Sequence, residues 1–220
     1  GNYSRFGFHH PGPAFFYVYA AGEWILSDAL RVAPARHNAH LLAGILLQAA
    51  FLAGLIALLA GYTERPWCVA WLLLAVLVAH FAFVPHAFAS IWPPFVLMLP
   101  LAGLVVAAAS LATGSHRGWL GLALTGGFLL HGHVAQPLVV FPLVALAVVG
   151  RWGATRQRHT GWVDRLLPPR PTRWVVGALV ALFLLPLVLD LTAGRESNAA
   201  RIVQHLIEAD ARTRPTWSDA

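Results

Sequence analysis

Charge is scarce in this sequence, and lysine is absent from it altogether. Only 11% of the 220 residues are charged, 58% are hydrophobic, and the mean hydropathy is +0.66. A soluble globular domain carries about twice that share of charge, so the composition excludes one and predicts a membrane protein. Cysteine occurs once, as Cys68, which excludes a disulfide framework and a cysteine-based zinc site.

The positive charge is carried by arginine alone. Fifteen arginines stand against nine acids, which leaves a net charge of +6. Residues 151–173 hold much of this surplus, with Asp164 as their one acid. Because cytoplasmic loops of membrane proteins are enriched in arginine and lysine, we expect this loop to face the cytoplasm, and we predict no nucleic-acid partner. Its arginines are Arg151, Arg156, Arg158, Arg165, Arg170 and Arg173.

Long apolar runs predict the fold class. A bilayer core of about 30 Å needs roughly 20 helical residues. Four runs have this length, at 41–60, 67–84, 95–112 and 174–193. Residues 119–150 are apolar but longer than one crossing needs, and a polar stretch ending in Pro137 interrupts them, which predicts a hairpin of two shorter spans. The expected fold is an all-α, polytopic transmembrane bundle of about six spans, with interfacial helices.

The two ends of the chain are more polar than its middle. Residues 13–30 are rich in aromatic side chains but include Glu23 and Asp28. Acids at the centre of a span cost about 2.5–3.5 kcal/mol each, which favours a helix that lies in the membrane interface. A helix that spans the membrane is the alternative for this segment. Residues 194–220 contain a predicted amphipathic helix, which Ser197 or Asn198 can cap. Its apolar face consists of Ile202, Val203, Leu206 and Ile207.

Alternation of the spans gives a consistent topology. With the arginine-rich loop in the cytoplasm, loops 62–66 and 113–118 also lie inside, whereas 84–94 and the turn at His131 lie outside. We expect one multi-pass transmembrane domain in the cytoplasmic (inner) membrane, over residues 1–220. Its parts are an extracytoplasmic turn and interfacial helix (1–37), a six-span bundle (38–193) with the cytoplasmic loop 151–173, and an extracytoplasmic tail (194–220).

The segment before the interfacial helix contains the most distinctive local pattern. Pro11 and Pro13 on either side of Gly12 form a rigid turn, which follows an arginine and two histidines. A guanidinium is suited to a forked contact with a phosphate, and an imidazole to a hydrogen bond with a phosphate or a sugar hydroxyl. The alternative is a loop whose aromatic residues anchor it to lipid headgroups. The cationic residues are Arg5, His9 and His10.

The run His10-Pro11-Gly12-Pro13, which leads into an aromatic-rich helix, resembles an element of the GT-C superfamily of polytopic glycosyltransferases. This superfamily includes protein O-mannosyltransferases, aminoarabinose transferases and arabinofuranosyltransferases, which use polyprenyl-phosphate sugars. Three further features are similar to features of its members, and the resemblance covers most of the chain. They are an arginine ahead of the next span (Arg31 or Arg36), the run Ile91-Trp92-Pro93-Pro94, and the turn His131-Gly132-His133-Val134.

The resemblance implies that a sugar moves from a polyprenyl-phosphate donor to a glycan, lipid or protein acceptor at the outer face of the membrane. Cations there would stabilise the leaving phosphate. The residues implied in donor binding are Arg5, His9, His10, Arg36, His131 and His133. Glu23 and Asp28 are candidate acceptor-side carboxylates, with solvated residues on a polar helix face as the alternative. The family's catalytic base lies upstream, and since this chain begins at Gly1 without a methionine or a charged leader, we expect a fragment that lacks it.

The histidines also support rival hypotheses. His131 and His133 form a His-x-His pair, which binds a divalent metal if His80 or His86 supplies a third ligand. Paired imidazoles also bind haem iron, and the residues available for that are His37, His40 and His80. A non-catalytic membrane scaffold is the third alternative. The composition implies the lipid bilayer as a partner, and the resemblance implies a lipid-linked sugar donor and a glycan, lipid or protein acceptor.

Overall fold

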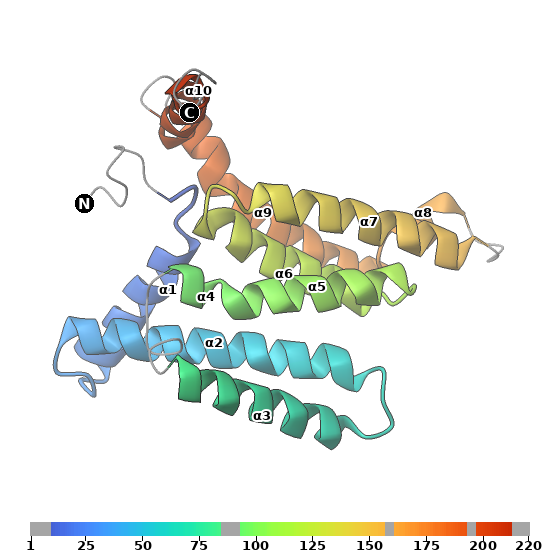
Figure 1. Ribbon diagram of the computed structural model, residues 1–220, viewed down its shortest axis with the longest axis horizontal. Coiled ribbons are helices and arrows are strands. Elements are labelled where there is room, and N and C mark those ends of the chain that lie inside the picture. The colour runs from blue at the N-terminus through green and yellow to red at the C-terminus, as the bar shows by residue number, and fades with distance from the viewer. Residues whose placement is uncertain (1–9, 85–92, 157–160, 193–196, 213–220) are drawn as a thin grey trace, which may run out of the picture.

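The computed structural model describes residues 10–84, 93–156, 161–192 and 197–212 (Figure 1). Within these ranges the regular structure is entirely helical, which confirms the predicted all-α class. Its elements are α1 (Ala14–Glu23), the π-helix η1 (Trp24–Ala29), α2 (Arg36–Ala60), α3 (Pro66–Phe83), α4 (Pro93–Val96), α5 (Met98–Ala112), α6 (Arg117–Gly132), α7 (Pro137–Thr155), α8 (Trp162–Leu166), α9 (Arg170–Thr192) and α10 (Asn198–Arg212).

Apolar helices occupy the places predicted for the six spans, as α2, α3, α5, α6, α7 and α9. Three of them, α2, α7 and α9, are long and apolar enough to cross a bilayer, which supports a membrane protein. The described apolar parts of α3 and α5 are shorter. Helix α6 has 16 residues and is therefore about 24 Å long. The count of six spans stays a prediction.

The predicted break in the long apolar stretch is confirmed. Helix α6 ends at Gly132, a polar turn follows, and α7 begins at Pro137. Proline suits the first position of a helix because its missing N–H has no intrahelical partner there. The two helices therefore form the expected hairpin, with the turn at one end of the bundle (Figure 1).

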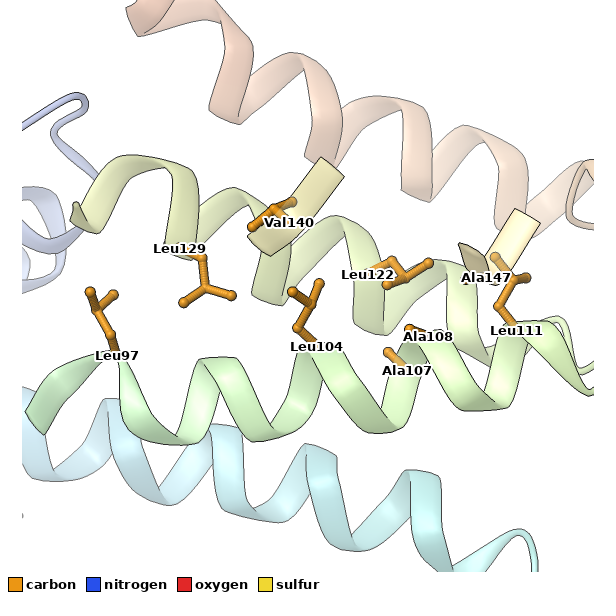
Figure 2. Packing of buried hydrophobic residues seen from close by; sticks show 9 residues of the cluster. All are labelled: Leu97, Leu104, Ala107, Ala108, Leu111, Leu122, Leu129, Val140 and Ala147. Carbon is orange, nitrogen blue, oxygen red and sulfur yellow. The ribbon is translucent and has the colours of Figure 1, made fainter. Parts of the chain in front are cut away.

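The core lies where α5 packs against α6 and α7. Figure 2 shows the buried cluster, which combines leucines with small residues: Leu97, Leu104, Ala107, Ala108, Leu111, Leu122, Leu129, Val140 and Ala147. Small residues let helices approach closely, which is how helices associate in lipid, where the hydrophobic effect contributes little. At Gly118 the approach is close enough that an added Cβ would lie 2.6 Å from the backbone oxygen of Ala107. Helix α6 therefore lies directly on the backbone of α5.

A buried glutamine connects α2 to the start of α5. Pro100 has no N–H, so the carbonyl of Val96, four residues earlier, lacks its usual helical donor. Gln48 is buried in α2 and donates hydrogen bonds from Nε2 to the carbonyls of Val96 at 3.2 Å and Phe95 at 3.1 Å. The polar residue within the run 41–60 thus satisfies the Val96 carbonyl that a proline leaves open, as buried backbone in a membrane requires.

The bundle has two chemically different ends. Successive long helices run in opposite directions, so the connections 61–65, 113–116 and the described residues 161–169 gather at one end (Figure 1). The predicted loop 151–173 is shorter than expected, because α7 continues to Thr155 and α9 begins at Arg170. Arg151 is wholly buried in α7, where it donates hydrogen bonds of 2.9 Å to the carbonyl of Gly114 and to Nδ1 of His116. It joins α7 to the α5–α6 connection and is not a loop residue.

The opposite end is covered by α1 and η1, which lie across it (Figure 1). Helix α1 has ten residues and η1 has six. The two would be about 24 Å long if all their residues were α-helical, which is less than the roughly 30 Å of a bilayer core. Phe16, Tyr17 and Trp24 are each more than half exposed. Exposed aromatic side chains on a short helix at the bundle end favour the interfacial placement.

The predicted amphipathic helix near the C-terminus is confirmed as α10. Its cap is Ser197, whose Oγ accepts a hydrogen bond from the backbone N–H of Ala200 at 3.1 Å. Of the predicted apolar face, Ile202 is buried, whereas Val203, Leu206 and Ile207 are more than half exposed. Helix α10 therefore packs on the bundle through part of its apolar face.

Candidate functional site

The proline–glycine turn, residues 10–13, is fastened to the end of α6. The backbone N–H of Gly12 donates to the carbonyl of His131 at 3.3 Å, and the N–H of Ala14 donates to Nδ1 of the same residue at 3.2 Å. A side chain at residue 12 would collide with the imidazole ring. The turn therefore needs glycine at this position because the His131 ring lies directly against its backbone.

His131 is buried, with 1% of its surface exposed. Since Nδ1 accepts from Ala14, the ring proton is on Nε2, which donates to the carbonyl of Phe183 in α9 at 2.7 Å. Both ring nitrogens are thus used within the protein, and the ring is neutral. This corrects the predicted role of His131: it connects the turn to α6 and α9, and it has no nitrogen left for a donor sugar or a metal.

The same turn is also tied to α10. The side chain of Asn198 donates from Nδ2 to the carbonyl of His10 at 2.9 Å. Asp190, near the end of α9, accepts hydrogen bonds from the backbone N–H groups of Asn198 and Ala199, both at 2.9 Å. A carboxylate at a helix N-terminus satisfies open N–H groups and complements the helix dipole. Asp190 therefore fixes the start of α10 beside the turn.

A charged cluster lies where α1 meets α2. Glu23 accepts from Nε of Arg36 at 3.0 Å and from Nε2 of His40 at 2.8 Å. Arg36 and His40 are four residues apart and so lie on the same face of α2. The side chain of Arg36 is 78% exposed, whereas that of Glu23 is 22% exposed. We call Glu23, Arg36 and His40 the Glu23 cluster.

Two predicted site residues, Glu23 and Arg36, thus come together, and the other predicted site residues that the structure describes do not join them. Asp28 is exposed on η1 and has no hydrogen bond or ion pair among the described residues. His133 is exposed, and its Nδ1 accepts from the backbone N–H of Ala135 at 3.1 Å, so it closes its own turn. Arg5 and His9 lie outside the described residues. Of the two candidate acceptor-side carboxylates, Glu23 is therefore paired with Arg36 and His40, whereas Asp28 lies apart from them.

The described residues give little support to the rival metal and haem hypotheses. Among the described residues, no three or more His, Cys, Asp or Glu side chains are grouped to hold a metal ion. His86 lies outside the described residues. His37 is exposed, and Nε2 of His40 is engaged by Glu23. His37 and His40 would each have to leave their present surroundings or partner to bind a buried haem.

The Glu23 cluster has a definite chemical capacity. The carboxylate of Glu23 engages Nε of Arg36, and the Arg36 side chain is largely exposed, so its two terminal nitrogens remain available to a ligand. Such a pair of N–H groups forms forked, charge-assisted hydrogen bonds with phosphate or carboxylate oxygens. An exposed ion pair contributes little to stability. The cluster therefore has the chemical groups that an anion-binding site needs.

Comparisons with known proteins add no family to this description. No protein-family model, no curated protein and no solved structure matches the chain. A function for the chain must therefore be argued from its own residues and from the arrangement that they adopt.

Proposed function

We propose that the chain belongs to a membrane glycosyltransferase that moves a sugar from a polyprenyl-phosphate donor to a glycan, lipid or protein acceptor. The resemblance of the turn at residues 10–13 to the GT-C element motivates the reaction class. The observation that carries the proposal is the Glu23 cluster, which presents an exposed guanidinium beside an aromatic-rich helix at one end of the bundle. The phosphate of a polyprenyl lipid lies at the same depth as such a helix.

The proposed reaction needs a cation near the donor phosphate. A base outside the described residues removes the proton of an acceptor hydroxyl, whose oxygen then attacks the anomeric carbon. The bond between that carbon and the phosphate oxygen breaks, and the phosphate leaves with the bonding electrons as a monoester. Arg36 would hold this phosphate through its two terminal nitrogens and stabilise the developing charge. Glu23 then acts as a positioning residue for Arg36, in place of the acceptor-side role first expected.

Replacing Arg36 by glutamine tests this proposal. We expect at least a tenfold loss of turnover, because the charge that stabilises the leaving phosphate is removed. The measurement is mass-spectrometric detection of free polyprenyl phosphate released by the full-length protein in membranes. The donors supplied are polyprenyl-phosphate mannose, arabinofuranose and aminoarabinose.

Arg201, an exposed arginine of α10, provides the matched control. Arg201→Gln should leave turnover within about twofold, because exposed charges away from the reaction contribute little. Full activity of Arg36→Gln would refute the role of the Glu23 cluster. Release of polyprenyl phosphate from none of the three donors by the wild-type full-length protein would count against the glycosyltransferase assignment itself.

The orientation that the proposal needs has its own measurement. We propose that all six apolar helices span the cytoplasmic membrane, with the Glu23 cluster outside and the arginine-rich connections inside. In a Cys68→Ser background, a cysteine at Ala135 should react with a membrane-impermeant maleimide in intact cells. A cysteine at Glu64 should react only after the membrane is permeabilised. Both positions are exposed. The reverse pattern of labelling would show that the protein has the opposite orientation in the membrane.

A further inference from the structure

An apolar groove of about 480 Å³ lies between α2 and α6, with α5 and α9 contributing to its walls. It follows α2 from Ala50 to Leu58, a length of about 12 Å, which approaches the depth of one bilayer leaflet. Leu120 and Leu124 of α6 line it and are each more than a third exposed. The groove therefore opens on the side of the bundle and presents apolar surface there.

A glycine creates part of this groove. A Cβ added to Gly54 would have no atom within 4 Å. Gly121, on the opposite wall, differs, because a Cβ there would lie 2.6 Å from that of Ala107 in α5. Gly121 is needed for helix packing, whereas Gly54 leaves space that none of the described residues fills.

An arginine stands at one mouth of the groove. Arg117 is the first residue of α6 and lines the groove at the arginine-rich end of the bundle. Its guanidinium lies against the end of α2, since a Cβ on Gly61 would be 2.7 Å from Nη1. Among the side chains and carbonyls that the structure describes, none forms an ion pair or a hydrogen bond with this guanidinium. A cation that pairs with none of the described acidic side chains therefore borders an apolar groove.

We propose that this groove binds one acyl chain of an anionic phospholipid, whose phosphate pairs with Arg117. The apolar lining fits a hydrocarbon chain, and the exposed guanidinium supplies the charge that favours an anionic headgroup over a zwitterionic one. The site lies at the end of the bundle opposite the Glu23 cluster (Figure 1). It is thus independent of the proposed reaction, and either assignment can fail without the other.

Native mass spectrometry of the full-length protein tests the site, with dioleoylphosphatidylglycerol and dioleoylphosphatidylcholine as probes. We expect one phosphatidylglycerol per chain to bind about fivefold more tightly than phosphatidylcholine, the factor that one arginine contributes toward an anionic lipid. Arg117→Gln should abolish this preference. Gly54→Leu should weaken the binding of both lipids about tenfold or more, because the new side chain occupies the place of several methylenes of the acyl chain.

Two matched variants separate the groove from the rest of the surface. Arg156→Gln removes another exposed arginine at the same end of the bundle. Gly177→Leu adds a side chain to α9 where nothing lies within 4 Å. Both should bind the two lipids as the wild type does. If Gly54→Leu does not fold, Ala50→Leu fills the same groove from an exposed position.

Three results would overturn the proposal. The first is equal binding of the two lipids by the wild-type protein. The second is unchanged lipid binding in both groove-filling variants. The third is a dimeric species without bound lipid, which would show that a second copy of the chain covers the groove.

Discussion

Replacing His131 by alanine is expected to lower the free energy of unfolding by about 2–5 kcal/mol, because a buried donor and a buried acceptor both lose their partner. In the wild type, the ring accepts from the N–H of Ala14 and donates to the carbonyl of Phe183. Buried polar groups left unsatisfied cost about 1–3 kcal/mol each. Unfolding in mixed micelles by added dodecyl sulfate, followed by circular dichroism, measures the change.

His133 provides the control, since it is two residues away but exposed. His133→Ala should cost less than about 1 kcal/mol, because water can replace its hydrogen bond to Ala135. His131→Asn should fall between wild type and alanine, since its oxygen can accept from Ala14 but its side chain is too short to reach Phe183. Equal stability of His131→Ala and wild type would show that the turn is not fastened through this ring.

Much of the helical framework could be predicted, because it depends on local sequence features. Apolar runs long enough for a bilayer and the breakers between them determine where helices begin and end, as Pro137 does for α7. The capped amphipathic helix α10 was predictable for the same reason. Such features act within a few residues of one another, so spacing along the chain is sufficient to recognise them.

The site was less predictable, because its contacts join distant residues. Ala14 and His131 are 117 positions apart, and no local pattern marks them as partners. Glu23 meets Arg36 and His40 only because η1 and the following residues fold the chain back onto α2. Arg31 adopts a left-handed backbone, with φ of 54°, which a non-glycine residue takes at a cost of about 1–2 kcal/mol. A reversal of this kind depends on tertiary packing.

The same distinction explains why His131 was assigned a role different from the one the structure shows. In sequence, a polar pair at a helix end is equally consistent with ligand binding and with a turn. Burial decides between these roles, and His131 is buried while His133 is exposed. Arg151 is a second case, since its charge suggests a loop whereas its surroundings are the interior of the bundle end. Hydrogen-bond partners, and not residue type, assign both roles.

Replacing Gly127 by alanine is expected to destabilise the bundle by about 1–3 kcal/mol, which is the cost of overpacking a core. A Cβ at this position would overlap the ring of Phe183. That ring is buried and makes edge-on contacts with Phe128 and His131, at centroid distances of 5.3 and 5.4 Å. Displacing the ring would therefore disturb its packing against both neighbours. The mixed-micelle unfolding measurement applies here too.

Replacing the neighbouring residue Gly126 by alanine should not destabilise the bundle. Its added Cβ would meet Val140 at 3.5 Å and Leu104 at 3.7 Å, which are ordinary contacts. Alanine also favours a helix over glycine by about 0.5–1 kcal/mol, so Gly126→Ala should be neutral or stabilising. Shortening Phe183 to leucine should relieve part of the loss in Gly127→Ala, giving a non-additive double mutant. Equal effects at both glycines would mean that α9 does not lie against α6 through Phe183.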